Sequence, residues 1–303
     1  MQSQNEIRQS ITDSIIDALK NGGLPPWRKP WNDDPAGFGL ATSLSTAKSY
    51  KGINQIILQL AASRNQWTSR WFATFNQIRA AGGCVKKGEK ATKVVLWKSI
   101  DRKRTNEDGK EVDDSYLVMR EFCVFNVEQT SGLDRFQVGF AKRHDNACER
   151  YENADAVIDA IGADIRYGGN EAYYRPSKDF IQLPHQHQFE SPEAFYETAF
   201  HELVHFSETR LNWDRATEGY PMGELVAEIG CCQMMAELGL PTTTNLQNHA
   251  SYLKSWLDGM VSDARFIFRA AAQASKAVDF LLSFSRTTAT ALEPVDVEEP
   301  VLA

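Results

Sequence analysis

The stretch AFHELVHFSE, residues 199–208, contains two histidines four positions apart, with a glutamate directly after the first. On a helix, His201 and His205 lie on one face, and both imidazoles can reach one metal ion. Glu202 is rotated about a third of a turn away, beside the ion, where it can take a proton from a metal-bound water. An imidazole pair, a carboxylate and an open water position are typical of a catalytic zinc site rather than a structural one.

The third ligand is expected from the next helix, in GELVAEIGCCQMMAEL, residues 223–238. Glu224 and Glu228 share one face of this helix. Two carboxylates on a mainly apolar helix are costly to bury without a counter-charge, which a divalent cation supplies. We predict Glu224 as the third ligand and Glu228 as the carboxylate that orients a ligand histidine through its other nitrogen. The reverse assignment stays open. The expected cofactor is Zn, with Mn or another divalent metal as the alternative.

Two further segments near the motif carry candidate groups. His185 and His187 form an H-x-H pair, for which a solvated loop is favoured over a metal role. The segment AYYRPSKDFIQLP, residues 172–184, is a candidate strand along a cleft, to which an extended peptide can add by backbone hydrogen bonds. Tyr173 or Tyr174 is a candidate oxyanion donor, and a packing role for both rings is an equal alternative.

The charge is distributed unevenly along the 303 residues, whose net charge is −7. Residues 1–135 carry a net charge of +5 and residues 136–303 a net charge of −12. Within residues 20–98 there are 13 basic and 3 acidic side chains. A basic half and an acidic half indicate two modules with different partners.

The sequence gives no sign of export or of a membrane partner. It lacks an apolar run of roughly 18 residues, and its first residues do not have the pattern of a secretory signal. Its five cysteines are scattered without a C-x-x-C pair. A reducing, cytoplasmic environment is therefore expected.

The basic half combines cations with aromatic rings, above all in PPWRKPW, residues 25–31. A single strand of nucleic acid needs cations for its phosphates and rings for its unstacked bases. Tryptophans packed in a core and lysines on a solvated surface are the alternative. The candidate contacts to single-stranded DNA are Trp27, Arg28, Lys29, Trp31, Arg70, Lys86, Lys87, Lys90 and Lys93.

Periodicity and turn residues predict an α+β fold. In the first half we expect helices at 5–20 and 52–65, a short strand at 71–75, a helical turn or two before Gly82, and paired strands at 90–100 and 116–129 around a charged hairpin or loop at 101–115. In the second half we expect a helix at 149–162, two or three strands within 163–184, and helices at about 192–211, 222–239, 246–258 and 262–284.

Several motifs in order resemble the ArdC-type antirestriction proteins: PPWRKPW, YKGINQIILQL, SRWFATFNQIRAAGG, VKKGEKATKVVLWK, VFNVEQ, SPEAFYETAFHELVHFSE, RLNW and GELVAEIG. The resemblance implies an N-terminal domain that binds single-stranded DNA, shared with TraC-type plasmid primases, and a mainly helical zincin-like metallopeptidase domain. It implies a plasmid or other mobile element as the carrier and protection of incoming DNA from host restriction. It also implies that His201, His205 and a downstream glutamate bind the metal, with Glu202 as the base.

We therefore expect a DNA-binding domain at 1–133, a linker at 134–147, a metallopeptidase domain at 148–286 and a disordered acidic tail at 287–303. The expected enzyme is a zinc metallopeptidase of the HExxH-plus-Glu type, with a host restriction protein or another DNA-associated protein as a candidate substrate. The alternative is a non-enzymatic shield that binds single-stranded DNA and keeps a structural or vestigial metal site.

Overall fold

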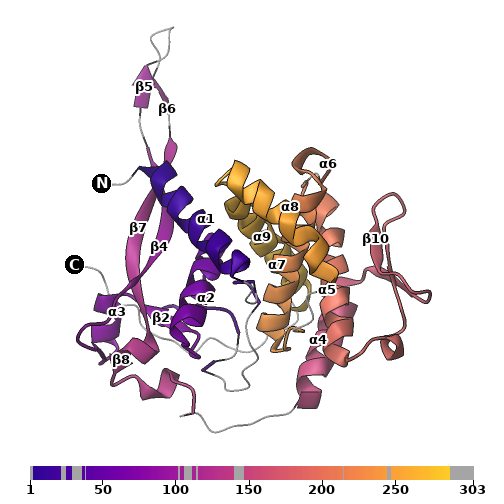
Figure 1. Ribbon diagram of the computed structural model, residues 1–303, viewed down its shortest axis with the longest axis horizontal. Helices are drawn as coiled ribbons and strands as arrows, with labels where there is room; N and C mark the ends of the chain where they lie inside the picture. Colours follow the sequence, from indigo (N-terminus) through magenta and orange to yellow (C-terminus); the bar gives the residue numbers. More distant parts are fainter. Residues whose placement is uncertain are drawn as a thin grey trace.

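The chain forms a sheet-containing N-terminal module beside a helical C-terminal module (Figure 1). The computed structural model describes residues 3–21, 25–28, 36–37, 39–101, 103–105, 111–113, 115–139, 147–213, 215–243 and 247–286. The acidic tail expected at 287–303 lies outside these residues. The α+β fold class is confirmed, with helices concentrated in the second half of the chain.

The N-terminal module is built on a four-stranded sheet in the order β1-β2-β7-β4. β1 (Thr42–Ser43) runs parallel to β2 (Trp71–Ala73), and β2 is antiparallel to β7 (Tyr116–Asn126). β7 forms a long antiparallel ladder with β4 (Thr92–Ile100). Beyond this ladder, β5 (Lys103–Thr105) and β6 (Glu111–Asp113) pair and project from the module (Figure 1), which confirms a hairpin within 101–115.

The strand predicted to reach residue 129 is shorter than expected. Asn126 ends β7, and its side chain accepts a hydrogen bond from the backbone of Glu128, which lies in the 3₁₀ turn η1 (Val127–Gln129). A side chain that satisfies the backbone locally competes with continued strand pairing. The chain then pairs β8 (Thr130–Ser131) with β3 (Cys84–Val85) and forms η2 (Asp134–Phe136).

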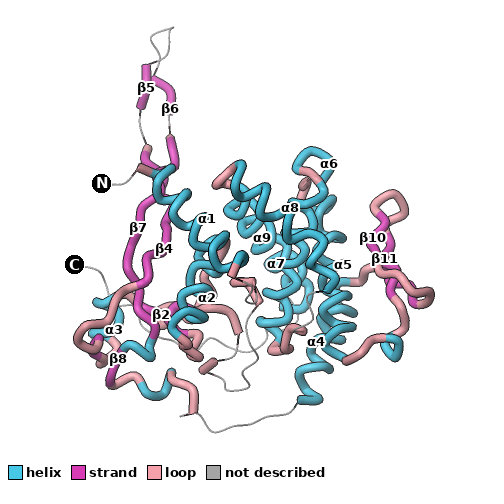
Figure 2. Tube along the Cα trace, in the orientation of Figure 1, coloured by secondary structure: helices cyan, strands magenta, loops and turns pink. Residues whose placement is uncertain are grey.

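Three helices belong to the N-terminal module: α1 (Gln4–Lys20), α2 (Ile53–Asn65) and α3 (Phe75–Ala80). α1 begins with a capping box in which Ser3 and Glu6 satisfy each other's backbone donors. Figure 2 shows α1 and α2 between the long strands and the helical module. The two long helices thus face both a sheet and a second set of helices.

The helical module begins with α4 (Ala147–Ile161) and a small sheet in the order β10-β11-β9. β9 (Asp164–Tyr167) is parallel to β11 (Phe180–Leu183), and β10 (Tyr173–Arg175) is antiparallel to β11. These are the short strands expected within 163–184. β10 lies at the edge of this sheet. The 3₁₀ turn η3 (Gln186–Gln188) follows β11.

Within its described residues the module continues with the helices α5 (Pro192–Arg210), α6 (Arg215–Glu218), α7 (Tyr220–Leu238), α8 (Gln247–Ser262) and α9 (Phe266–Arg286). Ser191 caps α5 by accepting from the backbone of Ala194, and Pro192 occupies its first turn. α7 ends at Gly239, whose φ of 73° is the left-handed conformation that glycine adopts without strain. The single-turn α6 was not predicted from the sequence.

One continuous hydrophobic cluster joins the two modules. It contains Ile15 from α1 and Ile56 from α2 together with Ala270 and Val278 from α9. Polar contacts cross the same boundary, because Thr12 Oγ1 donates to the carbonyl of Ala264 at 2.9 Å. The helical module is therefore packed directly against α1 and α2.

Among the helices that the structure describes, none combines the length and apolar character that crossing a membrane requires.

Candidate metal centre

α5 places both histidines of the HExxH motif in the interior beside α7. His205 is buried and His201 is partly buried, and their ring centroids lie 4.9 Å apart. The apolar residues around them, including Phe200, Leu203 and Val204, are fully buried. The sequence therefore folds this stretch as a core helix with its two imidazoles turned toward a neighbouring helix.

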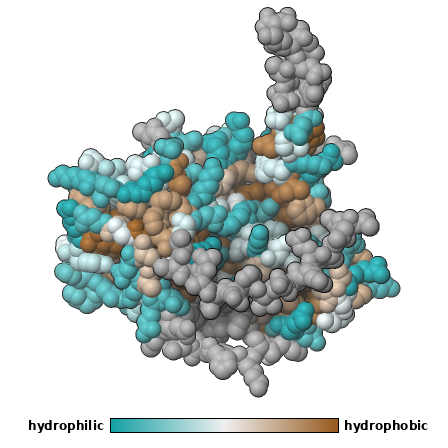
Figure 3. Space-filling view, turned by 180° about the vertical axis from the view of Figure 1, so that it is seen from behind, coloured by the Kyte–Doolittle hydropathy of each residue, from teal (hydrophilic) through white to brown (hydrophobic). Residues whose placement is uncertain are grey.

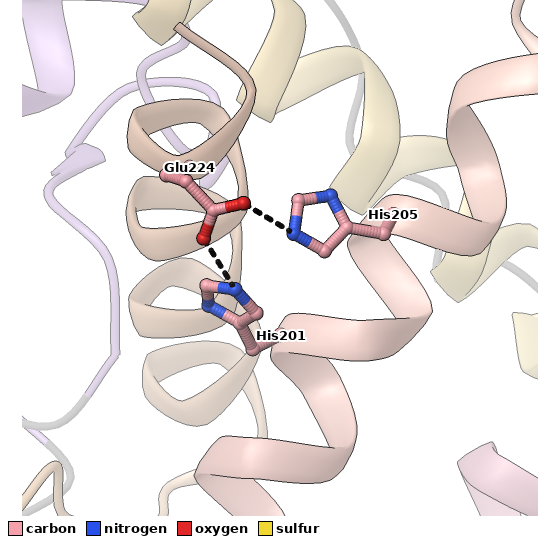
Figure 4. Close-up of side chains that lie close together, drawn as sticks. All are labelled: His201, His205 and Glu224. Atoms are coloured by element: carbon pink, nitrogen blue, oxygen red, sulfur yellow. Dashed lines mark ion pairs between the residues drawn. The ribbon is translucent and has the colours of Figure 1, made fainter. Parts of the chain in front are cut away.

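Glu224 of α7 approaches both imidazoles (Figure 4). Its Oε2 lies 3.4 Å from His201 Nε2, and its Oε1 lies 3.6 Å from His205 Nε2. One ligand atom from each of these three residues lies within 4.8 Å of the others. Two imidazole nitrogens and one carboxylate oxygen form a donor set that suits a divalent transition metal. In the described part of the chain, this is the one group of three such side chains found together.

The structure corrects the role expected for Glu228. Its Oε1 accepts hydrogen bonds from Arg28 Nε at 2.7 Å and from Trp27 Nε1 at 3.3 Å. Arg28 supplies the counter-charge that makes burial of this carboxylate tolerable. Glu228 thus belongs to a buried ion pair one turn away from Glu224.

The carboxylate beside the second nitrogen of His205 is Glu208, whose Oε1 lies 2.6 Å from Nδ1. If Nδ1–H donates to this carboxylate, the lone pair of Nε2 is free for a metal. Sequence reasoning missed Glu208, although its position, three residues after His205, was a usable signal. Residues i and i+3 on a helix are neighbours.

Glu202 is buried next to the ligand group. Burial raises the pKa of Glu202, while His201 and a hydrogen bond from the backbone of Tyr174 act in the opposite direction. Tyr174 belongs to the edge strand β10, so this strand runs past the predicted base. The hydroxyl of Tyr174 instead donates to Asp179 at 2.9 Å, and Tyr173 packs edge-on against Phe180.

The two histidines differ in proton affinity. Burial opposes charging of His201, but the hydrogen bond to Glu224 and the negative charges of Glu202, Glu224 and Glu228 together outweigh it, so the pKa of His201 is raised. The pKa of His205 is lowered well below its usual value by burial, by His201 and by Arg215. Burial raises the pKa of Glu208 to about 7.

Arg215 of α6 reaches into the same group. Its Nη2 lies close to both ring nitrogens of His205, at 2.9 Å from Nε2, and it lies 3.2 Å from Glu208 Oε1. Its Nη1 lies 3.7 Å from Glu224 Oε1. A cationic side chain of the protein therefore contacts two of the three candidate ligands.

A cavity of about 430 Å³ opens beside the group. It is lined by Tyr174, Pro176, Glu208, Thr209, Trp213, Arg215 and Tyr220. Aromatic walls with a few charged groups are typical of a site that accepts a side chain or a small molecule.

Eight of the nine residues proposed to contact DNA fall into three sets. Trp27 and Arg28 are buried, with 2% and 3% of their surface exposed, which contradicts a direct DNA contact by either side chain in this arrangement. Lys29 and Trp31 lie outside the described residues. Four lysines are exposed: Lys86, Lys87, Lys90 and Lys93.

Arg70 is intermediate between these cases. Its guanidinium lies 4.8 Å from the ring centroid of Trp71, and it is partly buried. Burial lowers the pKa of Arg70, although Glu237 acts in the opposite direction. His185 and His187 are exposed and stack on each other at 5.5 Å, in agreement with a solvated pair.

Two family models match the chain, one to each module. A model described as "Zincin-like metallopeptidase" matches residues 152–273. A model described as "N-terminal domain of anti-restriction factor ArdC" matches residues 5–125. The helical module is thus of the zincin-like metallopeptidase class.

More than nine tenths of the chain also matches solved structures of one protein. It is 34% identical to the antirestriction ArdC protein from plasmid R388 in its metal-free crystal structure, with a TM-score of 0.75. The match covers 93% of this chain and 98% of that one. The Mn(II)-bound structure of the same protein gives 33% identity and a TM-score of 0.72, over 92% of this chain and 98% of that one. This chain therefore belongs to the ArdC-type antirestriction family.

Curated relatives extend the comparison. Two proteins named DNA primase TraC from Escherichia coli are 37% and 35% identical to the chain over 94% of its length. The chain spans only 28% and 20% of those primases. The uncharacterized protein y4eC of Sinorhizobium fredii is 31% identical, and 92% of each chain is covered.

Proposed function

We propose that the chain protects incoming DNA from restriction by combining two activities. Its N-terminal module holds single-stranded DNA, and the centre on α5 and α7 hydrolyses peptide bonds in a host restriction protein or another DNA-associated protein. The observation that carries the peptidase part is the meeting of His201, His205 and Glu224 beside Glu202.

In this proposal His201, His205 and Glu224 hold a divalent metal, either Zn or Mn, the ion bound in a crystal structure of the related ArdC protein. Such an ion supplies Lewis-acid chemistry, because it polarises a carbonyl oxygen and makes water more acidic. Glu208 fixes the orientation of His205 through Nδ1.

Glu202 is the proposed proton carrier. Its carboxylate takes a proton from the attacking water and passes that proton to the leaving amine. Its raised pKa brings it nearer to neutral pH, where a group can both accept and return a proton. The free edge of β10, which is paired on one side with β11, offers backbone groups to an extended peptide.

The DNA part of the proposal rests on the exposed surface of the sheet module. Figure 3 shows hydrophobic surface at the base of the projecting hairpin. Leu96, Trp97, Tyr116 and Leu117 are between 41% and 60% exposed there. The exposed lysines of 86–93 supply cations, and the exposed rings of Trp97 and Tyr116 supply aromatic faces, which are the two kinds of group that a single strand requires.

The peptidase part is tested with Glu202→Gln, which keeps the side-chain volume and removes the proton acceptor. We expect metal content to stay unchanged and cleavage of an unfolded casein substrate to fall by about 10²–10⁴-fold. Antirestriction is measured in parallel as the transfer of unmodified DNA into a restricting host. If Glu202→Gln protects as well as the wild type, peptide hydrolysis is not the basis of protection.

The second candidate function is a shield that binds single-stranded DNA without hydrolysis. The contact of Arg215 with His205 and Glu224 favours it, because a protein cation next to the ligands competes with a metal ion. This alternative predicts full protection by Glu202→Gln and no cleavage of casein by either form.

A further inference from the structure

Arg28 is the most completely buried cation in the described part of the chain, with none of its side chain exposed. Its Nη2 lies 2.6 Å from Glu197 Oε1, and its Nε lies 2.7 Å from Glu228 Oε1. Its Nη1 donates to the carbonyl of Thr243 at 2.8 Å. One guanidinium therefore binds α5, α7 and the segment that follows α7.

The two carboxylates lie one helical turn from the candidate metal ligands. Glu197 precedes His201 by four residues on α5, and Glu228 follows Glu224 by four residues on α7. Because four residues make about one turn, each carboxylate lies on the same face as its neighbouring ligand. The Arg28 bridge and the metal-ligand group therefore span the same pair of helices, one turn apart.

The surroundings of Arg28 hold the bridge in one geometry. Burial by itself lowers the pKa of Arg28, but Cys232, Glu228 and Glu197 raise it by more, so the net direction is upward. Trp27, the preceding residue, packs edge-on against Trp256 at 6.0 Å and donates to Glu228. A planar guanidinium can bind two carboxylates at fixed angles, which the point charge of a lysine cannot reproduce.

We propose that Arg28 is a positioning residue for the metal centre: it sets the spacing of α5 and α7, and so the distance between the histidines and Glu224. This inference rests on the metal site proposed above. It makes a residue of the N-terminal module necessary for tight metal binding by the helical module. Groups that orient metal ligands without touching the metal typically change affinity by about 10–100-fold.

Loss of the Arg28 charge and loss of its positioning role change the metal affinity in opposite directions, so a substitution at Arg28 can distinguish them. Arg28→Met removes a positive charge near the site, so electrostatics alone predicts tighter binding of a cation. Loss of positioning predicts weaker binding. The double variant Arg28→Met/Glu228→Gln removes one charge of each sign and keeps the local net charge of the wild type.

The experiment is a calorimetric titration of the EDTA-stripped full chain with Mn²⁺ and with Zn²⁺, alongside its thermal unfolding temperature without metal. We expect about 10–100-fold weaker metal binding for both variants and a smaller loss for Arg28→Lys. Arg28→Met leaves two buried carboxylates without their partner and lowers the unfolding temperature strongly. The double variant recovers part of that loss but not the metal affinity.

Arg286→Met is the matched control, because Arg286 also forms an ion pair with α7, at the exposed side chain of Glu237. The metal affinity of this variant should equal that of the wild type. Metal affinity within about twofold of wild type in the folded double variant and in Arg28→Lys overturns the positioning role. A wild-type chain that binds neither ion refutes the metal centre itself.

Discussion

The choice between Glu224 and Glu228 shows what a single residue's neighbours decide. Both glutamates lie on one face of α7 and both are buried, so the sequence offers no local basis for ranking them. The ranking comes from Arg28, about 200 positions away, which binds Glu228 and leaves Glu224 to the histidines. Long-range ion pairs of this kind have no periodic signature in a sequence.

Metal affinity is also expected to depend on Glu208, a residue that does not itself bind the ion. Glu208→Ala removes the carboxylate that lies 2.6 Å from His205 Nδ1 and frees the ring to rotate. We expect about 10–100-fold weaker binding of Mn²⁺ or Zn²⁺ by titration calorimetry. Glu193→Ala, at the first turn of the same helix, is the control. Equal affinities of the two variants would contradict this role.

Glu208 also predicts a pH dependence of stability in the metal-free protein. Burial raises the pKa of Glu208 to about 7 in the folded chain, above the unfolded value of about 4.3. A raised pKa means that the stabilising contribution is complete below the unfolded pKa and is lost as the pH rises through about 7. The loss is on the order of 3 kcal/mol.

This dependence is measured by urea unfolding of the EDTA-treated chain between pH 5 and pH 8. Glu208→Gln cannot ionise, so its stability should change less over the same range than that of the wild type. Parallel pH profiles of the two proteins would show that Glu208 titrates normally.

At the scale of elements, hydrophobic periodicity predicted nearly every long helix and strand. α5 and α7 agree with their expected ranges to within two residues, because each carries a long apolar pattern between clear end signals. α6 was missed because a single turn has no periodicity to detect. That short element nevertheless carries Arg215, so the metal site predicted from the sequence lacked one of the side chains that contact the candidate ligands.

The position of α6 leads to a prediction about metal competition. Arg215→Met removes the cation that contacts His205 and Glu224. Two unit charges 4 Å apart interact by about 4 kcal/mol at an effective dielectric constant of 20. If Arg215→Met relieves a third of such a repulsion between Arg215 and the metal ion, metal binding becomes about tenfold tighter. The two zinc affinities are measured by competition of the metal-free wild type and the metal-free variant against a fluorescent zinc chelator.

Arg269→Met is a suitable comparison, since Arg269 pairs with Glu218 at the other end of α6. It should leave the affinity unchanged. Weaker metal binding by Arg215→Met than by the wild type would mean that Arg215 supports the site through Glu208 instead of competing for it.

At the scale of the whole molecule, the modules inferred from charge share one core. PPWRKPW has the same local chemistry whether its side chains face solvent or a partner module, so composition left DNA contact and core packing equally open for Trp27 and Arg28. Their burial is decided by Trp256, Glu197 and Glu228, which lie in the other half of the chain. Of the proposed DNA contacts that the structure describes, the exposed ones are Lys86, Lys87, Lys90 and Lys93 of the sheet module.

These lysines carry the last prediction. Lys86→Ala/Lys87→Ala/Lys90→Ala removes three exposed cations without touching the shared core. Each phosphate contact to a single strand contributes about 0.7 to the slope of log affinity against log salt, so loss of three reduces the slope by about 2. Fluorescence anisotropy with a labelled oligothymidine across a salt series measures it. Lys254→Ala, an exposed lysine of the acidic half, should keep the wild-type slope. An unchanged slope in the triple variant would place the DNA elsewhere on the molecule.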